Sequence, residues 1–146
     1  MQTRRVPAAG PWAEVVGYSR ALRVGDVVYV AGTAALAPDG SIAYPGDPYR
    51  QTLRCLEIIA DALGRLGSCP AQVVRTRLFV KHREHWQGVG RAHGEYFGSS
   101  KPVTSMIFAE LMDHDMLVEV EAEALVRFTP GCTAVEPAVE ARHGGG

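Results

Sequence analysis

Three glutamates near the C-terminal end of the chain, Glu119, Glu121 and Glu123, alternate with apolar residues. In an extended strand such residues point the same way, and successive carboxylates lie about 7 Å apart. Like charges at that distance repel unless cations lie beside them, and Arg75 and Arg77 are the candidates. This favours a paired polar sheet face for Glu121 and Glu123. For Glu119, nearest the strand start where a cleft forms more easily, structural and functional roles both stay open.

Other groups are weaker candidates for chemistry. His82 and His85 have a spacing that could suit a metal, but no third ligand is close in sequence, so we expect a solvated helix end. The Asp-His-Asp run at residues 113–115 is typical of a polar loop. His93 lies on an apolar helix face, and two interpretations stay open for it, a hydrogen-bonded core residue or a pocket-lining one.

Composition narrows the class of protein. The chain has 146 residues, 47% hydrophobic and 21% charged, which is typical of one globular domain. The net charge of −1 disfavours nucleic acid as the main partner. No apolar run reaches the roughly 18 residues of a membrane helix, and the N-terminus lacks the apolar region of a secretory signal. We therefore expect no membrane association and a cytoplasmic location.

The cysteines and the motif search add two negative expectations. Cys55, Cys69 and Cys132 form an odd, scattered set without CxxC spacing, which predicts neither a disulfide framework nor a structural zinc site. The sequence contains no phosphate-binding loop, dinucleotide fingerprint or nucleophile elbow, and we expect no cofactor.

Two segments have helical periodicity. The first opens with Asp47 as N-cap and Pro48 at the first helical position, repeats apolar residues at three- and four-residue steps, and meets a stop at Gly67. The second is predicted from about residue 84 to residue 97 and ends at Gly98. Its apolar face is expected to carry five residues: Trp86, Val89, His93, Tyr96 and Phe97.

The remaining periodic segments have period two and predict strands. Residues 19–24 and 27–32 flank a Gly25-Asp26 turn and form a hairpin. Residues 73–81, 102–108 and 117–128 are the other strands. In the first of these three, Val74, Thr76, Leu78 and Val80 are expected on one face, with Arg75 and Arg77 on the other.

The element order is therefore strand, strand, helix, strand, helix, strand, strand, an α+β fold. Two helices cannot cover both faces of such a sheet, so they should pack on one face and leave the other for water or another subunit. We expect residues 1–130 to form one domain and residues 131–146 to form a flexible C-terminal tail.

The order and spacing of five segments resemble the Rid family, the reactive intermediate deaminases also called RidA or YjgF. These segments are Gly17-Tyr18-Ser19-Arg20-Ala21, Val28-Tyr29-Val30-Ala31-Gly32-Thr33, Gln51-Thr52-Leu53-Arg54-Cys55-Leu56-Glu57, Val73-Val74-Arg75-Thr76-Arg77-Leu78-Phe79-Val80 and Val118-Glu119-Val120-Glu121-Ala122. The resemblance spans about residues 15–128. It implies a chorismate-mutase-like α+β fold, a mixed sheet with two helices on one face, and a homotrimer with clefts between subunits.

The resemblance also implies an activity and a site. Active Rid proteins hydrolyse reactive enamines and imines to a keto acid and ammonia, with an arginine that binds the substrate carboxylate and a glutamate that positions or activates water. Carried over by position, Tyr18 and Glu119 are the implied catalytic residues. Ala31 and Gly32 are the implied backbone contacts to substrate.

Three positions depart from the family pattern. Thr104 stands where the arginine belongs, Gly90 where the second helix has an asparagine, and Met106 where a smaller residue is common. A hydroxyl cannot replace a planar five-donor cation, and the lost contact corresponds to about 30- to 1,000-fold in binding. Either the substrate lacks that carboxylate, or another cation serves. Arg20 is the candidate because it shares a strand face with Tyr18, and Arg91 is a weaker one.

The sequence thus predicts a Rid-type enzyme that acts on an enamine, imine or related carbonyl compound by hydrolytic deamination or tautomerisation, but is not a standard 2-imino acid deaminase. Glu119 would be the general acid/base, and Tyr18, Gly32 and Thr104 would hold polar substrate atoms. The alternative is a non-catalytic trimer that binds a metabolite or a protein. RNA cleavage is disfavoured by the balanced charge.

Overall fold

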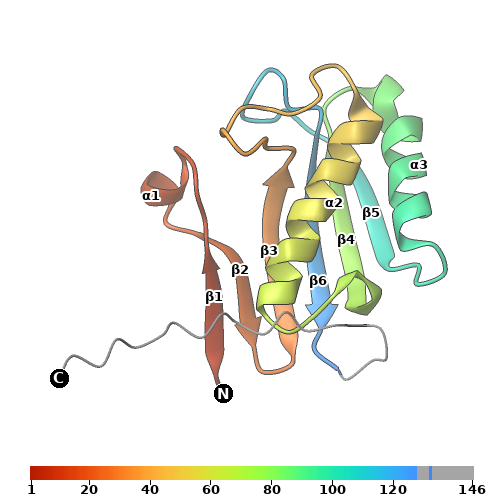
Figure 1. Cartoon of the computed structure of the whole chain (residues 1–146). Helices are drawn as coiled ribbons and strands as arrows, with labels where there is room; N and C mark the ends of the chain where they lie inside the picture. Colours follow the sequence, from red (N-terminus) through yellow and green to blue (C-terminus); the bar gives the residue numbers. More distant parts are fainter. Residues whose placement is uncertain (128–131, 133–146) are drawn as a thin grey trace.

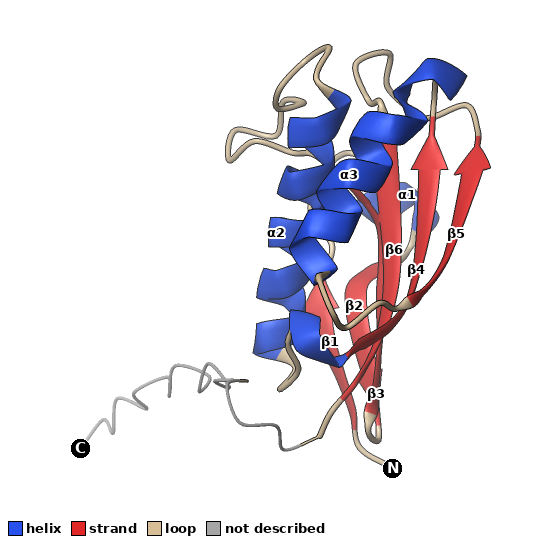
Figure 2. Ribbon diagram, turned by 90° about the vertical axis from the view of Figure 1, so that its right-hand side faces the viewer, coloured by secondary structure: helices blue, strands red, loops and turns tan. Residues whose placement is uncertain are grey.

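The fold is a single six-stranded sheet with two long helices on one face (Figures 1 and 2). The structure is a computed structural model that describes residues 1–127 and Cys132. Its elements are β1 (Thr3–Pro7), α1 (Ala13–Val16), β2 (Ser19–Val24), β3 (Val27–Ala34), α2 (Pro48–Arg65), η1 (Pro70–Gln72), β4 (Val73–Val80), η2 (Arg83–His85), α3 (Trp86–Phe97), β5 (Val103–Phe108) and β6 (Val118–Leu125). The strand order is β1-β2-β3-β6-β4-β5, with β4 and β5 parallel and the other pairs antiparallel. The α+β prediction and the mixed sheet are confirmed.

Both predicted helices form, with one change at a start. Asp47 caps α2 by accepting a hydrogen bond from the Arg50 backbone N–H at 3.0 Å, and Gly67 follows the helix with a positive φ of 84°. The second helix begins two residues later than predicted, because residues 83–85 form the 3₁₀ turn η2. The expected apolar face is wrong at Trp86, whose side chain is 50% exposed.

The core lies between the sheet and α2. Four inward residues of β6 and three of α2 are at most 3% exposed: Val118, Val120, Ala122 and Ala124, and Leu56, Ile59 and Leu63. Because α2 and α3 cover the same face, the other face is open, as predicted (Figure 2). Tyr29, Val103 and Ile107 lie there, each more than 40% exposed.

Strand β4 has a different register from the one expected at its start. The pairing with β6 shifts between Val73 and Arg75, so that Val73 is buried and Val74 is 39% exposed. The prediction that Val74 shares the inner face with Thr76, Leu78 and Val80 is therefore wrong. A bulge of this kind follows from the pairing with a partner strand, which one strand's own alternation does not reveal.

The N-terminal segment forms elements that the sequence pattern did not indicate. Strand β1 extends the sheet by pairing with β2, with Val6 opposite Ala21, and the short helix α1 follows it. Only Val6 of the five β1 residues is buried. An edge strand exposed on both sides carries no hydrophobic alternation, so periodicity could not detect it.

A disulfide joins Cys69 and Cys132, whose Cα atoms are 5.8 Å apart. The expectation of no disulfide framework is wrong for these two cysteines, whereas Cys55 is a buried free thiol. The topology explains the pairing. Antiparallel β4 and β6 are neighbours, so the start of β4, next to Cys69, and the end of β6, before Cys132, lie at the same end of the sheet. Apart from Cys132, the predicted tail at residues 131–146 lies outside the described residues.

Candidate functional site

A cavity of about 430 Å³ lies beside the C-terminal end of β3. It brings together five of the site residues predicted from the sequence: Tyr18, Arg20, Ala31, Gly32 and Glu119. These come from the start of β2, the end of β3 and the start of β6, which are adjacent in the sheet order. Tyr18 and Arg20, from the start of β2, and Glu119, from the start of β6, all line it.

Gly32 makes room for the Glu119 carboxylate. The β3–β6 pairing is interrupted between Val30 and Thr33, so Ala31 and Gly32 form an irregularity opposite β6. A Cβ added to Gly32 would overlap the Glu119 carboxylate. A glycine is therefore needed here for close approach of a side chain to the backbone, rather than for a turn.

Arg20 is held by backbone carbonyls. Its Nη2 donates to Ala31 O at 2.7 Å and to Gly32 O at 2.5 Å, while its Nε is buried without a partner among the described residues. Burial lowers the pKa of Arg20, opposed by the nearby Tyr18 and Glu119. The guanidinium is thus fixed at the rim of the irregularity, with donor capacity left over.

Glu119 differs from the other two glutamates of its strand. Glu121 lies 3.5 Å from the Arg77 guanidinium, and Glu123 lies 3.5 Å from Arg77 and 3.9 Å from Arg75, so the predicted ion pairing is confirmed for both. Glu119 has no such partner within the described residues. Burial raises the pKa of Glu119 above its usual value, Arg20 opposes this, and Glu121 adds to it. A half-buried carboxylate with a raised pKa accepts a proton more readily than an exposed one, which suits a general acid/base.

This electrostatic setting predicts a stability difference that depends on pH. Because the folded protein holds the Glu119 proton more tightly than the unfolded chain, the stability linked to this group falls as pH rises through its folded pKa. Glutamine mimics the neutral acid, so Glu119→Gln should raise the melting temperature at about pH 7.5. The difference in melting temperature between the two proteins should disappear when the pH is below 4.5, the ordinary pKa of a glutamate. Thermal unfolding of both proteins across this range measures it.

The matched control is Glu123→Gln, on the same strand and face. Loss of its contacts to Arg75 and Arg77 should leave the melting temperature unchanged or slightly lower at neutral pH. A Glu119→Gln variant that is less stable than the wild type at neutral pH would show that the carboxylate is a structural partner instead.

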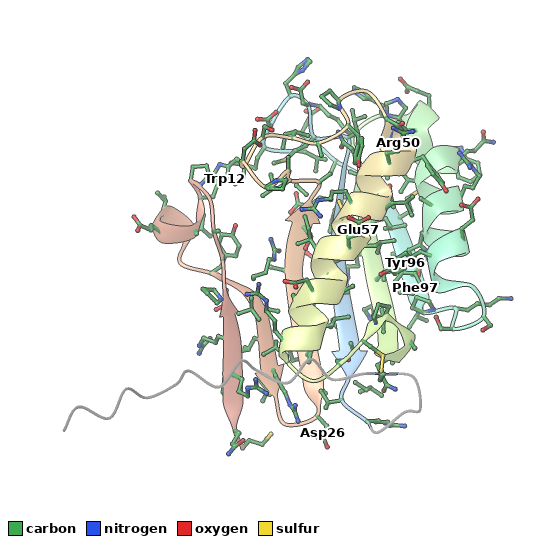
Figure 3. The ribbon with its side chains drawn as sticks, in the orientation of Figure 1. Trp12, Asp26, Arg50, Glu57, Tyr96 and Phe97 are labelled. Carbon is green, nitrogen blue, oxygen red and sulfur yellow. A yellow bond between two sulfur atoms is a disulfide. The ribbon has the colours of Figure 1, made fainter. Side chains whose placement is uncertain are left out.

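An apolar wall closes the cavity, and the sequence pattern did not reveal it. Trp12, Val16, Leu36, Met112 and Met116 line it together with the polar residues. Trp12 lies just before α1 (Figure 3), and the two methionines flank the Asp-His-Asp loop. The segments that supply this wall are a four-residue helix and an irregular loop, which have no hydrophobic periodicity. The only sequence feature that points to the region is the Gly10-Pro11-Trp12 run.

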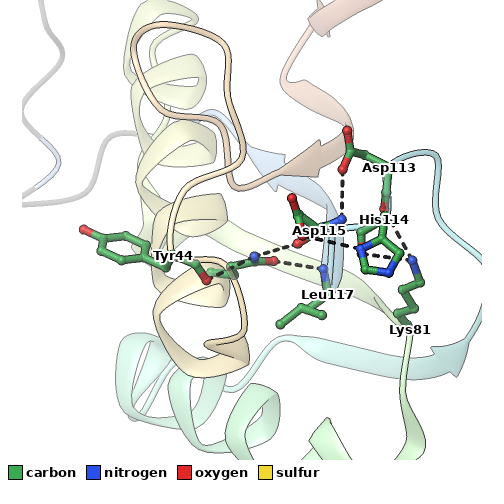
Figure 4. Close-up of polar contacts among 7 residues, drawn as sticks. Tyr44, Lys81, Asp113, His114, Asp115 and Leu117 are labelled. Atoms are coloured by element: carbon green, nitrogen blue, oxygen red, sulfur yellow. Dashed lines mark hydrogen bonds and ion pairs between the residues drawn. The ribbon is translucent and has the colours of Figure 1, made fainter.

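Gln51 anchors the loop that leads into β6. Its fully buried side chain donates from Nε2 to Asp115 O at 2.9 Å and to Tyr44 O at 3.3 Å, and its Oε1 accepts from the Leu117 N–H at 2.9 Å (Figure 4). Lys81 supports the same loop by donating to His114 O at 3.1 Å. The Asp-His-Asp run is therefore a polar loop, as predicted.

Removing this anchor should destabilise the fold. Gln51→Ala leaves the buried Leu117 N–H without its partner and removes the bond to the part-buried Asp115 carbonyl, which corresponds to about 2–4 kcal/mol of unfolding free energy. Urea denaturation measures the loss. Gln87→Ala, a glutamine on the exposed side of α3, is the control and should change stability by less than about 0.5 kcal/mol. Equal stabilities for the two variants would refute the anchoring role.

The other predicted site residues lie apart from this cavity within one chain. Thr104, on the edge strand β5, lines a separate cavity of about 350 Å³ with His93, Phe97 and Lys101. Gly90 of α3 faces Met106, because a Cβ on Gly90 would lie 3.8 Å from the Met106 Cε. The structure thus divides the predicted residues into a Glu119 group and a Thr104 group.

His93 combines the two interpretations left open for it. Its Nε2 lies 2.8 Å from the Thr76 hydroxyl, its ring packs on Phe97 at 4.7 Å, and it also lines the Thr104 cavity. Arg91 is engaged elsewhere, 3.6 Å from Glu95 and stacked over Tyr49. Within the described part of the chain there is no cluster of three potential metal ligands and no helix that could span a membrane.

A six-stranded mixed sheet with two helices on one face is the architecture of a known protein family. The family model described as endoribonuclease L-PSP matches residues 10–126. The chain therefore belongs to the YjgF/RidA family, which includes the L-PSP and RutC proteins. Members of this family are enamine/imine deaminases, and they form trimers.

Particular relatives agree with this assignment. The chain is 41% identical over 123 residues to an uncharacterized protein of Streptomyces coelicolor, covering 83% of this chain and 90% of that one. It is 32% identical to a RutC family protein of Pyrococcus abyssi, covering 73% and 84%. The crystal structure of Rv2704 from Mycobacterium tuberculosis, a YjgF/YER057c/UK114 family member, superposes with a TM-score of 0.76 at 39% identity, covering 86% of this chain and all of that one.

Proposed function

We propose that this protein hydrolyses a reactive imine or enamine, and that Glu119 is the general acid/base. The observation that carries the proposal is the half-buried Glu119 carboxylate, which lacks an ion-pair partner among the described residues and lines a cavity with Arg20 and Tyr18. The two neighbouring glutamates, by contrast, are paired with arginines. Membership of a family of imine deaminases supports the same chemistry.

The proposed reaction uses the two protonation states of Glu119 in turn. Its carboxylate accepts a proton from a water molecule as the water oxygen bonds to the carbon of the protonated imine, and the C=N bond becomes the C–N single bond of a neutral carbinolamine. The carboxylic acid then gives this proton to the amine nitrogen. The C–N bond breaks and ammonia leaves as the carbinolamine hydroxyl becomes the carbonyl and returns its proton to the Glu119 carboxylate, which releases it to water. Burial raises the pKa of Glu119, which makes its carboxylate a better proton acceptor than that of an exposed glutamate.

Arg20 and Tyr18 are the proposed binding groups of this pocket. The guanidinium is already positioned by Ala31 O and Gly32 O, so it needs little ordering when a substrate arrives. The Tyr18 hydroxyl can donate to a carbonyl or carboxyl oxygen, and Arg20 places a positive charge in the same cavity lining.

We further propose a homotrimer in which Thr104 of one subunit lies across the cleft from the Glu119 cavity of the next, at the position of the family's arginine. Thr104 carries no charge, so the preferred substrate has no carboxylate at that position. The open sheet face, with Tyr29, Val103 and Ile107 exposed, supports burial against other subunits.

The test is ammonia release from imines and enamines generated in situ. A matched pair of substrates, one with and one without a carboxylate beside the imine carbon, separates the proposed preference from the family's usual one. Faster decay with this protein than in buffer alone, larger for the uncharged substrate, is expected. A compound that raises the melting temperature without being converted would support the alternative, a metabolite-binding trimer. Light scattering gives the oligomeric state.

A further inference from the structure

A chain of three hydrogen bonds leads from α3 to the surface of β5. His93 Nε2 lies 2.8 Å from Thr76 Oγ1, Thr76 Oγ1 lies 2.8 Å from Thr104 Oγ1, and Thr104 Oγ1 lies 2.9 Å from Pro102 O. Thr76 is fully buried, so water cannot substitute for either of its partners. Thr104, the last hydroxyl in this series of hydrogen bonds, is exposed.

Counting the available protons assigns a donor and an acceptor to each of these three hydrogen bonds. Pro102 O can only accept, so the Thr104 hydroxyl proton is used there. The Thr76 hydroxyl must then donate to Thr104, because Thr104 has no second proton. The Thr76 oxygen is left to accept, and His93 must donate to it from Nε2–H.

The opposite direction satisfies fewer groups. If His93 carried its proton on Nδ1, Thr76 would donate to Nε2, Thr104 would donate to Thr76, and the contact to Pro102 O would have no proton. Both the Nε2–H imidazole and the imidazolium support the first arrangement. Burial lowers the pKa of His93, which favours the neutral ring over the imidazolium.

We propose that Thr104 presents a hydrogen-bond acceptor to the cleft, so that the substrate group held there is an N–H or O–H donor. The Thr104 oxygen has two lone pairs, and Thr76 uses one of them. With its own proton committed to Pro102, the hydroxyl offers only the second lone pair outward. A carboxylate would meet a lone pair, whereas an amide, amine or hydroxyl group would meet its complement.

Lys101, which also lines the cavity beside Thr104, is a competing group for anions. Lys101 is exposed and reaches the cavity from a left-handed backbone conformation, φ 40°. An anion drawn to Lys101 would bypass the hydroxyl, so the experiment includes Lys101→Met.

The first measurement is the tautomer of His93, by long-range ¹H–¹⁵N NMR of the full chain. The expected result is the Nε2–H form in the wild-type protein, independent of any substrate or activity. The Nδ1–H form would overturn the proposal, because the hydroxyl chain would then run in the other direction.

The second measurement compares pyruvamide and pyruvate, which differ in a donor amide against a carboxylate, by NMR titration. This step rests on the proposed function, since both probes are carbonyl products of imine hydrolysis. Pyruvamide should bind about tenfold more tightly than pyruvate. Thr104→Val should remove that preference and Thr104→Ser should keep it. Equal affinities in both the wild type and Lys101→Met, no binding of pyruvamide, or a preference that survives in Thr104→Val would each overturn the proposal.

The two proposals can fail separately. In Glu119→Gln the Thr104-dependent preference for pyruvamide should persist, because the hydroxyl chain does not include Glu119. If no protein form releases ammonia but this preference holds, the hydrolytic function is wrong and the acceptor role stands. If ammonia is released but Thr104→Val leaves selectivity unchanged, the acceptor role of Thr104 is wrong and the hydrolytic function stands.

Discussion

Replacing Glu119 with glutamine is expected to lower kcat for imine hydrolysis by about 10²- to 10⁴-fold. The amide fills the same volume beside Gly32 and keeps a polar contact to the cavity, but it cannot accept a proton from water. Since the substrate is bound mainly by other groups, KM should change much less than kcat. Steady-state ammonia release measures both constants.

The pH profile separates a catalytic from a positioning role for Glu119. If the carboxylate is the base in the first step, wild-type kcat/KM should rise with pH through the raised pKa of Glu119, above the ordinary 4.5. The residual activity of Glu119→Gln should lack that limb. Glu123→Gln, which alters a carboxylate paired with two arginines, should keep the wild-type rate and profile. Equal losses in the two variants, or an unchanged limb in Glu119→Gln, would remove Glu119 from the mechanism.

Replacing Thr104 with arginine is expected to shift selectivity towards imines that carry a carboxylate. A guanidinium can bind a carboxylate through two parallel hydrogen bonds, which corresponds to about 30- to 1,000-fold in affinity. We expect kcat/KM for a 2-imino acid to rise by at least about 30-fold, while turnover of an uncharged imine falls. Competition between the two substrates in one mixture measures the ratio directly.

The matched control is Thr104→Gln, which adds length and polarity at the same position without charge. It should not improve turnover of the carboxylate substrate. Both variants remove the acceptor of the Thr76 hydroxyl, so both should lose a similar amount of stability, about 1 kcal/mol. An arginine variant with unchanged selectivity and the same oligomeric state as the wild type would show that Thr104 does not face the substrate.

Local patterns in the sequence predicted most of the fold because its main elements have strong periodicity. The β2–β3 hairpin with Gly25-Asp26 at its turn, the Asp47-Pro48 start of α2 and the alternation of β6 all follow from local physical preferences. Strand β1 and the 3₁₀ turn before α3 do not. Their positions depend on the neighbours that they contact, which one segment's residues cannot specify.

The candidate site shows the same division. Tyr18, Gly32 and Glu119 could be named in advance because family resemblance marked their positions, and Arg20 because it shares a strand face with Tyr18. The structure brings all four to one cavity. Trp12 and the two methionines that complete it were missed, since nothing local distinguishes a pocket-lining apolar residue from a surface one. The hydrogen bonds that link Thr104 to Thr76 and His93 were also beyond reach, because these two residues lie on other elements of the fold.

The bond between Cys69 and Cys132 turns part of the polypeptide into a covalent ring with a sequence separation of 63 residues. The ring includes Thr76, His93, Thr104 and Glu119, whereas Tyr18, Arg20 and Gly32 lie outside it. Closing a loop of this length restricts the unfolded chain by about 4 kcal/mol. Oxidation would therefore close a covalent ring around the segment that carries Glu119 and Thr104, whereas the segment that carries Arg20 is joined to it only by the β3–β6 pairing and by packing.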